Sequence, residues 1–377
     1  MRTIERVSEE KVTRPQETTT ESRPWIEAAE VLLVTRLVFL EIAFAANWLL
    51  AWAHGEAKPG FFNIWLKWDA ISFLLIAQHG YTTLLTHPHS TAFFPLLPLM
   101  LRGFLALDVP GSIAGLVIAA ACSLVAFAYL FRLAEEELGA RGGRRAVLYL
   151  ALFPCAVFLI AGYTEPVFLA GAIPAFYYAR KGRWHLVGPP AALAVATRFA
   201  GVFLLLGLAV EFMRQRDLTP RQTAKAVLAL AVGALPLVAY GAFLYRTRGT
   251  PLYYFTDQRL GWQRGFANPI EAFLNTIHHS GSPLQITAAV VGVCFTLWAA
   301  HKREWGYAAF MGASLGALMM STYYLSIPRV LVSLFPITLL LAEHTRERPE
   351  RHTPLLAAMS ALAAAGVVAF TRGLGFY

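Results

Sequence analysis

Charged residues are scarce in this sequence, since Asp, Glu, Lys and Arg make up only 15% of its 377 residues. Soluble domains carry about a quarter of such residues, so the composition argues against an ordinary soluble domain and indicates a membrane protein. Apolar runs that approach or exceed the thickness of a hydrocarbon core, roughly 30 Å, recur along nearly the whole chain. The net charge of +9 is therefore attributed to basic cytoplasmic loops, and no nucleic-acid partner is expected.

Metal-binding patterns are also missing. Each of the three cysteines lies inside an apolar run, namely Cys122, Cys155 and Cys294. This placement is typical of small core residues and not of a disulfide or metal set. The pairs His87/His89 and His278/His279 indicate solvated loops, and the sequence has neither HExxH nor an outer Asp-x-Asp pair. We therefore expect no metal site and no required cofactor.

The first 27 residues form no signal peptide, because they are polar, mixed in charge and rich in Thr and Pro. They are predicted to be a cytoplasmic tail of limited order. A single transmembrane domain is predicted to follow over residues 28–371. Its eleven predicted spans lie at about 28–52, 111–131, 146–161, 166–180, 186–198, 199–214, 224–246, 284–301, 306–322, 329–343 and 354–371.

The basic clusters orient these spans. They are Arg141/Arg144/Arg145, Arg180/Lys181/Arg183, Arg214/Arg216/Arg221, Lys302/Arg303 and Arg346/Arg348/Arg351. With the N-terminus inside, all of them are cytoplasmic, together with roughly two-thirds of all Lys and Arg, as the positive-inside rule expects. A further crossing at 93–107 would move the Arg141 cluster outside and is rejected. The protein is predicted to be a multi-pass protein of the cell membrane.

Two long segments, 53–110 and 247–283, remain on the predicted outer side. Within the first, residues 61–80 show apolar positions at helical spacing with Trp65 and Trp68, which predicts a helix lying in the membrane interface. Asp69 lies in this stretch. A carboxylate at the rim of a bilayer is costly, so Asp69 is a functional-site candidate.

A few other charges fall on the same side: Glu165, Arg198, Arg329, Lys67, Arg259 and Arg264. Glu165 before Pro166 also suits a helix cap, and a lone Arg at an interface can extend toward lipid headgroups. Arg binds phosphate through its planar fork, whereas a carboxylate can deprotonate a hydroxyl. Together these residues describe a site in which a phosphate leaves and an alcohol attacks.

Several blocks of the sequence resemble a known family, the PIG-V mannosyltransferases and their bacterial relatives. The blocks are Lys67-Trp68-Asp69 through Tyr81, Phe93-Phe94-Pro95-Leu96-Leu97-Pro98-Leu99, Gly162-Tyr163-Thr164-Glu165, Ala196-Thr197-Arg198-Phe199-Ala200-Gly201, and Arg329-Val330-Leu331 to Phe335-Pro336. They occur in the family's order and cover about residues 60–340. Lys67 stands where Arg is commoner, and Thr164 where Ser is commoner.

This resemblance implies the all-α GT-C fold of membrane glycosyltransferases, with long outer loops after the first and seventh helices. It also implies a polyprenyl-phosphate sugar donor and inverting transfer on the extracytoplasmic side. Asp69 matches the catalytic aspartate, Glu165 the second acidic residue, and Arg198 and Arg329 the later basic positions. Arg259, Arg264 and Lys67 are further candidates for phosphate binding.

The resulting hypothesis is a mannosyltransferase that acts on a glycolipid or glycan acceptor, with Trp68, Tyr81 and Tyr163 as candidates to line the sugar site. The alternative is a polytopic lipid or sugar transporter, or flippase. Such proteins commonly contain internal repeats and ionisable groups near the bilayer midplane. No obvious inverted repeat is present, and the unexplained charges gather at one face.

Overall fold

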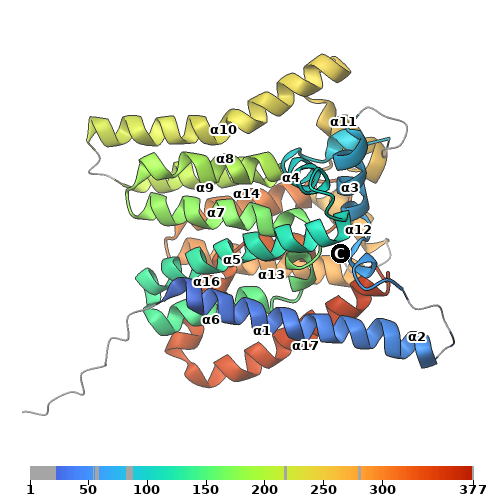
Figure 1. Ribbon diagram of the computed structural model, residues 1–377. Coiled ribbons are helices and arrows are strands. Elements are labelled where there is room, and N and C mark those ends of the chain that lie inside the picture. The colour runs from blue at the N-terminus through green and yellow to red at the C-terminus, as the bar shows by residue number, and fades with distance from the viewer. Residues whose placement is uncertain are drawn as a thin grey trace, which may run out of the picture.

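The computed structural model describes residues 23–53, 55, 59–81, 88–215, 219–278 and 282–375. Over these residues the protein is all-α, and the only β pairing is an isolated bridge between Phe266 and Ser321. The predicted all-α polytopic fold is confirmed (Figure 1). Most of the predicted tail, residues 1–22, lies outside the described residues, as do His87, Arg216 and His279.

The chain folds into a bundle of helices joined by short helical turns. The first half contains α1 (Pro24–Phe44), the π-helix η1 (Ala45–Leu49), α2 (Leu50–Ala53), the 3-10 helix η2 (Asn63–Trp65), α3 (Asp69–His79), η3 (Ser90–Ala92), α4 (Leu96–Leu105), α5 (Gly111–Leu138), α6 (Ala140–Ala151), η4 (Ala156–Leu159) and α7 (Thr164–Arg180). The second half contains η5 (Trp184–Leu186), α8 (Gly188–Thr197), α9 (Ala200–Arg214), α10 (Pro220–Arg248), α11 (Tyr253–Trp262), α12 (Pro269–Ile277), α13 (Ser282–His301), α14 (Trp305–Met319), α15 (Ile327–Ser333), α16 (Pro336–Glu347), η6 (Pro349–Arg351) and α17 (His352–Thr371).

Four helices in the described part of the chain are long and apolar enough to cross a membrane, namely Gly111–Leu138, Pro220–Arg248, Pro283–His301 and Pro349–Thr371. A fifth is obtained if α15 and α16, bent by 71° at their break, count as one span. The predicted number of eleven crossings is not confirmed and stays a prediction.

Two predicted spans are wrong as continuous helices. The span 329–343 breaks between Ser333 and Pro336, and the span 146–161 ends its α-helix at Ala151. In both places a proline follows the break, Pro336 in the first and Pro154 in the second. Proline has no N–H to donate and disfavours the α conformation in the residue before it, so helices tend to end there.

Helix α7 forms the centre of the bundle and is buried over nearly its whole length, with α5, α8 and α9 packed against it. Its small residues allow this close packing. A Cβ atom at Gly171 would lie 2.4 Å from the carbonyl oxygen of Pro190 in α8. Small residues at helix contacts are typical of membrane bundles. The start of α7, which carries Glu165, is therefore held firmly inside the protein.

The outer helices expose large apolar side chains instead. They include Leu33, Val34, Leu37 and Val38 of α1, and Leu228, Leu235 and Val238 of α10. Apolar surface of this extent is unfavourable in water but suits contact with lipid chains. The long helices thus provide a bilayer-facing scaffold.

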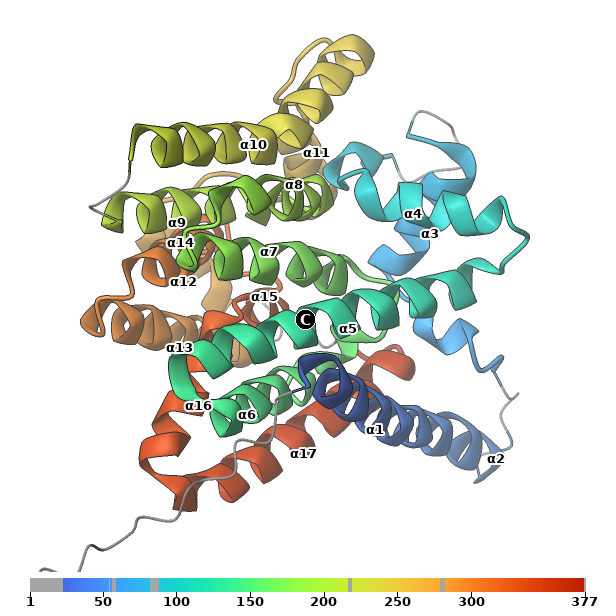
Figure 2. The same ribbon diagram turned by 60° about the vertical axis from the view of Figure 1, so that its left-hand side comes forward.

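The two predicted outer segments are partly helical, and their helices α3, α4, α11 and α12 lie toward one end of the bundle in Figure 1. Figure 2 shows α3 and α4 side by side beyond the start of α5. The helix predicted over 61–80 is divided into η2 and α3. Trp68 separates them with a positive φ of 45°, so Asp69 becomes the first residue of α3. The conformation at Trp68 thus fixes where α3 begins and where Asp69 lies.

Candidate active site

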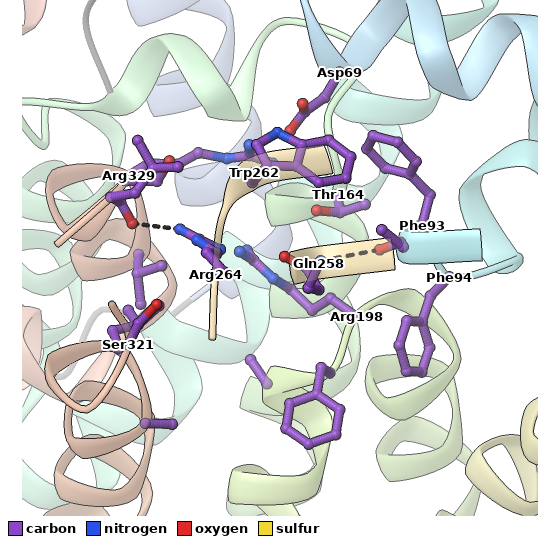
Figure 3. A pocket seen from close by; sticks show the side chains of 18 of the residues that line it. Asp69, Phe93, Phe94, Thr164, Arg198, Gln258, Trp262, Arg264, Ser321 and Arg329 are labelled. Atoms are coloured by element: carbon purple, nitrogen blue, oxygen red, sulfur yellow. Dashed lines mark hydrogen bonds and ion pairs between the residues drawn. The ribbon is translucent and has the colours of Figure 1, made fainter. Parts of the chain in front are cut away.

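A cavity of about 710 Å³ opens at this end of the bundle. Its lining comes from the start of α3, the segment 92–94, the starts of α7 and α9, helix α11 and the following loop, the end of α14, and α15. Figure 3 shows Asp69, Arg198, Arg264 and Arg329 converging on it from these separate elements. Residues far apart in the sequence thus meet in one polar site with apolar walls.

Glu165 is the anchor of the charged groups and is 0% exposed. One of its carboxylate oxygens accepts hydrogen bonds from Nη1 of Arg198 at 2.9 Å and from Nε of Arg329 at 2.5 Å. A carboxylate buried this deeply is costly unless it is paired and hydrogen-bonded. Glu165 is therefore a partner of two guanidinium groups, and the simple helix-cap alternative is insufficient to explain it.

Asp69 lies at the rim of the same cluster, with its side chain 24% exposed. Its Oδ2 atom accepts a short hydrogen bond from Nη1 of Arg329. Arg329 thus bridges both carboxylates, while its guanidinium carbon lies 4.5 Å from the ring centre of Tyr163. Because its side chain is partly exposed and lines the cavity, Asp69 is accessible to a ligand there, whereas Glu165 is not.

The position of Arg329 is unfavourable in isolation. It lies in the first turn of α15, where the helix dipole disfavours a positive charge. The two carboxylates and the faces of Tyr163 and Phe158, the latter 5.2 Å away, offset this cost. The neighbouring Arg198 is fixed further by Ser333, whose hydroxyl lies 3.0 Å from Nη1.

Arg264 differs from the other two arginines because no carboxylate among the described residues pairs with it. Its Nη2 donates to the carbonyl oxygen of Leu325 at 2.5 Å, and its buried Nε has no hydrogen-bond partner in this structure. Burial lowers the pKa of the Arg264 guanidinium. An anion in the cavity would stabilise its charge and accept its remaining hydrogen bonds.

Backbone strain gathers around this cavity. Of the five non-glycine residues with positive φ in the described chain, Trp68 precedes Asp69, Gln263 precedes Arg264, and Ser326 begins the helix that carries Arg329. Such conformations cost of order 1–3 kcal/mol each and persist only where the surrounding structure enforces them. The strain is a further reason to treat this cavity as the candidate functional site.

The first of the two predicted outer segments contacts α11 beside the cavity. The hydroxyl of Thr91 donates a short hydrogen bond to the buried Asp257, and Nδ1 of His89 lies 3.3 Å from the same carboxylate. Tyr240 donates to the carbonyl oxygen of Thr91 at 2.7 Å. We call the contact of Asp257 with Thr91 and His89 the loop clasp; it positions Phe93 and Phe94, which line the cavity.

Seven of the predicted site residues meet here: Asp69, Glu165, Arg198, Arg264, Arg329, Trp68 and Tyr163. All of them except Glu165, which is fully buried and paired with Arg198 and Arg329, line the cavity, and the other three predicted site residues do not. Arg259 is exposed on α11 and Lys67 lies outside the lining, so the structure does not support direct phosphate contacts for them. Tyr81 instead donates to the carbonyl oxygen of Phe93 at 2.9 Å, which is a structural role.

The sequence interpretation did not select several lining or supporting residues, including Ser333, Gln258 and Trp262. Ser333 follows Arg329 by four residues, and this spacing places two side chains on one helix face. Gln258 and Trp262 share the same spacing on α11. Without knowing which helix faces the cavity, the spacing alone carried no functional signal.

The described residues contain no group of three or more His, Cys, Asp or Glu side chains that could hold a metal ion. The prediction of a solvated loop is wrong for His89, which contacts the buried Asp257. His278 is exposed, and its Nδ1 lies 2.8 Å from the carbonyl oxygen of Leu274.

Comparison with known proteins gives a consistent result. A family model described as dolichyl-phosphate-mannose-protein mannosyltransferase matches residues 86–245, which include Glu165 and Arg198. GPI alpha-1,6-mannosyltransferase 2 of Rattus norvegicus is 34% identical over 149 residues, or 36% of this chain and 29% of that protein. The Homo sapiens protein is 34% identical over 129 residues, or 31% and 25% respectively. The matched segments thus span less than a third of these relatives.

A solved structure shares the fold over most of the chain. It is the crystal structure of ArnT from Cupriavidus metallidurans bound to undecaprenyl phosphate, with a TM-score of 0.55 and 16% identity over 91% of this chain and 65% of that one. The two proteins therefore share a fold. The partial matches to mannosyltransferases agree with the resemblance to the PIG-V family that the sequence blocks indicate.

Proposed function

We propose that this chain is an integral membrane glycosyltransferase that moves mannose from a polyprenyl-phosphate-mannose donor to a hydroxyl of a lipid-linked or glycan acceptor. The main supporting observation is the meeting of Asp69 with three arginines in one cavity. The relatives named as mannosyltransferases, and the undecaprenyl phosphate bound to ArnT, favour this sugar and this type of donor.

In the proposed reaction, Asp69 accepts the proton of the acceptor hydroxyl as that oxygen attacks the anomeric carbon. General-base assistance of this kind contributes about 10²–10⁴-fold to the rate. Arg264, with Arg198 and Arg329, stabilises the charge that develops on the departing phosphate. Tyr163 and Trp68 provide aromatic surface beside the sugar. A single displacement inverts the anomeric centre, so a β-linked donor gives an α-linked product.

The proposed location is the cell membrane, with the N-terminus in the cytoplasm and the cavity on the extracytoplasmic side. The basic clusters that follow α5, α7, α9, α13 and α16 support this orientation, because they fall away from the cavity end. We expect no required metal ion, so transfer should persist after chelation of divalent cations. A loss of transfer that one divalent ion restores would contradict this expectation.

The test is single-turnover transfer from polyprenyl-phosphate-mannose to a panel of membrane lipids and lipid-linked glycans. Asp69→Asn should lower the rate about 10²–10⁴-fold, because the amide cannot accept the proton. The control is Asp108→Asn, an exposed carboxylate outside the cavity lining at a positive φ that Asn tolerates. It should transfer at the wild-type rate, with the same α-linked product.

Near-normal transfer by Asp69→Asn would remove Asp69 from the mechanism, and a β-linked product from a β-linked donor would contradict inversion. Absence of both transfer and donor binding in the wild type would favour the transporter alternative. In that case Asp69 and Arg329 would form part of a substrate gate.

A further inference from the structure

Two uncharged polar side chains that the proposed reaction does not use line the cavity. They are Gln258 of α11 and Thr164, the first residue of α7. Figure 3 shows one below the other, with Asp69 above them in the view. Both side chains belong to helices and not to free loops, so a hydrogen bond that they offer to a ligand has a fixed direction.

The amide of Gln258 is oriented by its neighbours. Its Nε2 lies 3.5 Å from the carbonyl oxygen of Ala92 and 3.3 Å from the hydroxyl oxygen of Tyr254. A backbone carbonyl can only accept a hydrogen bond, so the nitrogen of the amide and not its oxygen faces Ala92. Among the described residues no donor pairs with Oε1. This oxygen is an acceptor left open at the cavity.

The hydroxyl of Thr164 is open in the same sense. It does not cap α7, and it bonds to no group in the described part of the chain. The hydroxyl of Thr197, which also lines the cavity, instead donates to the carbonyl oxygen of Leu193 at 2.7 Å in its own helix. Buried polar groups are normally hydrogen-bonded. Thr164 is thus available to a group that enters the cavity.

The chemistry of these atoms selects one part of a lipid-phosphate sugar. The oxygen of an amide accepts and does not donate, so its partner must carry a proton. A singly charged phosphodiester has no such proton, and an apolar lipid tail has no polar group. The hydroxyls of the sugar remain. They can donate to the amide oxygen, and they can both donate to a threonine hydroxyl and accept from it.

We propose that Gln258 and Thr164 bind hydroxyl groups of the transferred sugar, and that Oε1 of Gln258 determines which sugar is accepted. This inference rests on the proposed function and adds two specificity-determining residues to it. Trp262 follows Gln258 by one helical turn and also lines the cavity. Its ring therefore provides apolar surface on the face of α11 that carries the open acceptor. This combination suits a sugar, whose ring bears both C–H and O–H groups.

A fixed acceptor discriminates between sugars. When the hydroxyl that faces Gln258 is missing, Oε1 stays buried without a donor, and sites built to bind a hydroxyl reject such analogues for this reason. The loop clasp supports the orientation of the amide. Asp257 directly precedes Gln258, and Thr91 directly precedes the Ala92 carbonyl that Gln258 contacts.

The experiment is a binding titration of the detergent-solubilised full chain. No acceptor is present, so any effect of a hydroxyl comes from the donor. The ligands are polyprenyl-phosphate-mannose, called the parent, and the analogues that each lack one hydroxyl of the mannose. For the wild type we expect at least one analogue to bind about tenfold more weakly than the parent.

Gln258→Met completes a cycle with these ligands, because Met has a similar length and no acceptor of comparable strength. The parent should bind this variant about tenfold more weakly than the wild type, since its hydroxyl loses its partner. The analogue without that hydroxyl should bind the variant no more weakly than the parent does. Affinities are compared within one variant, so a lowered stability does not obscure the result.

Variants of Thr164 test the second residue independently. Thr164→Val keeps the shape of the side chain without the hydroxyl and should remove the discrimination against one analogue. Thr164→Ser keeps the hydroxyl and should retain this discrimination. The control is Gln78→Met, the same exchange at an exposed glutamine of α3 outside the cavity lining. It should keep the wild-type order of affinities.

Equal affinity of the wild type for the parent and all analogues overturns the inference and leaves the proposed function intact. Discrimination that persists unchanged in Gln258→Met, or that disappears in Gln78→Met as well, also overturns it. Discrimination that persists in full in Thr164→Val removes Thr164 from the site. Absence of binding by every ligand in the wild type overturns the inference and the proposed function together. The expected discrimination without sugar transfer by the wild type contradicts the proposed function alone.

Discussion

Two charged clusters lie at opposite ends of the central helix α7. Glu165 in its first turn belongs to the cavity cluster, and Arg180 at its last position belongs to what we call the far cluster. At 1.5 Å per residue, these two positions are about 22 Å apart along the helix. Both clusters consist of basic side chains and carboxylates, so the kind of charge alone does not distinguish them.

Their pairing does. In the far cluster each cation has a carboxylate: Arg180 pairs with Glu137 and Glu304, Lys181 with Glu136, and Arg214 with Glu211 and Glu304. These pairs tie α5, α7, α9 and α14 together. The cavity cluster instead leaves Arg264 without a carboxylate and opens onto aromatic walls. A cluster that closes on itself fastens helices, whereas one with an unpaired charge can bind a ligand.

The largest expected difference between the clusters is in stability. Glu165→Gln removes a buried carboxylate from two guanidinium groups, and breaking a buried pair in this way costs about 3–5 kcal/mol. Glu304→Gln acts on a carboxylate that is 31% exposed, so its cost should be about 0–1 kcal/mol. Denaturant unfolding of both variants in detergent measures the two free energies.

The wild type in the same detergent is the reference for both values. Equal free energies of unfolding for Glu165→Gln and Glu304→Gln would contradict the assignment of Glu165 as the buried anchor of the cavity cluster.

The next largest difference is expected in catalysis. Arg329→Lys keeps the charge but loses the fork that joins Asp69 and Glu165, so transfer should fall about 10²–10³-fold, equivalent to about 2.7–4 kcal/mol. Arg180→Lys makes the same exchange in the far cluster and should change the rate less than about threefold, since it is remote from the chemistry. Single-turnover rates check both.

A loss of transfer in Arg180→Lys as large as that in Arg329→Lys would mean that the far cluster controls the reaction. The comparison between the two ends of α7 would then fail.

The smallest effect concerns the loop clasp, which touches neither cluster. Asp257→Asn weakens the hydrogen bond from Thr91 and the contact with His89, which together position Phe93 and Phe94. We expect KM for the donor to rise about three- to tenfold, or roughly 1 kcal/mol, with kcat little changed. Steady-state kinetics at varied donor concentration measure both quantities.

Glu271→Gln is the matched control, because this carboxylate lies in the first turn of α12 outside the cavity lining. It should leave KM unchanged. A fall in kcat without a change in KM for Asp257→Asn would show that the clasp acts on the reaction step and not on the positioning of the donor.

Much of the helical content was predictable because apolar runs impose helices wherever backbone groups cannot bond to water. The predicted spans at 111–131 and 224–246 correspond to α5 and α10. The breaks at Pro154 and Pro336 were missed, since hydropathy continues across them although the helix does not. In this chain a single proline can set where a helix ends, whereas the existence of a helix depends on the hydropathy averaged over many residues.

Asp69 was recognisable from the sequence because an isolated carboxylate among aromatics beside a membrane span needs a reason to be there. The pairing of Glu165 with Arg198 and Arg329 was not, because it joins residues 33 and 164 positions apart through helix packing. Helix packing also decides that Arg264 lines the cavity and Arg259 does not. Two arginines of one short segment differ there only through the fold of α11 and the strained turn at Gln263.

Composition and local pattern therefore determined the membrane class, the helices and the candidate residues, because these depend on short-range preferences and on the solvent. The tertiary structure alone decided which charges are neutralised and which one remains. Charge balance in a buried site depends on distances of a few ångströms between segments remote in sequence, and Coulomb interactions in a low-dielectric interior change steeply over such distances.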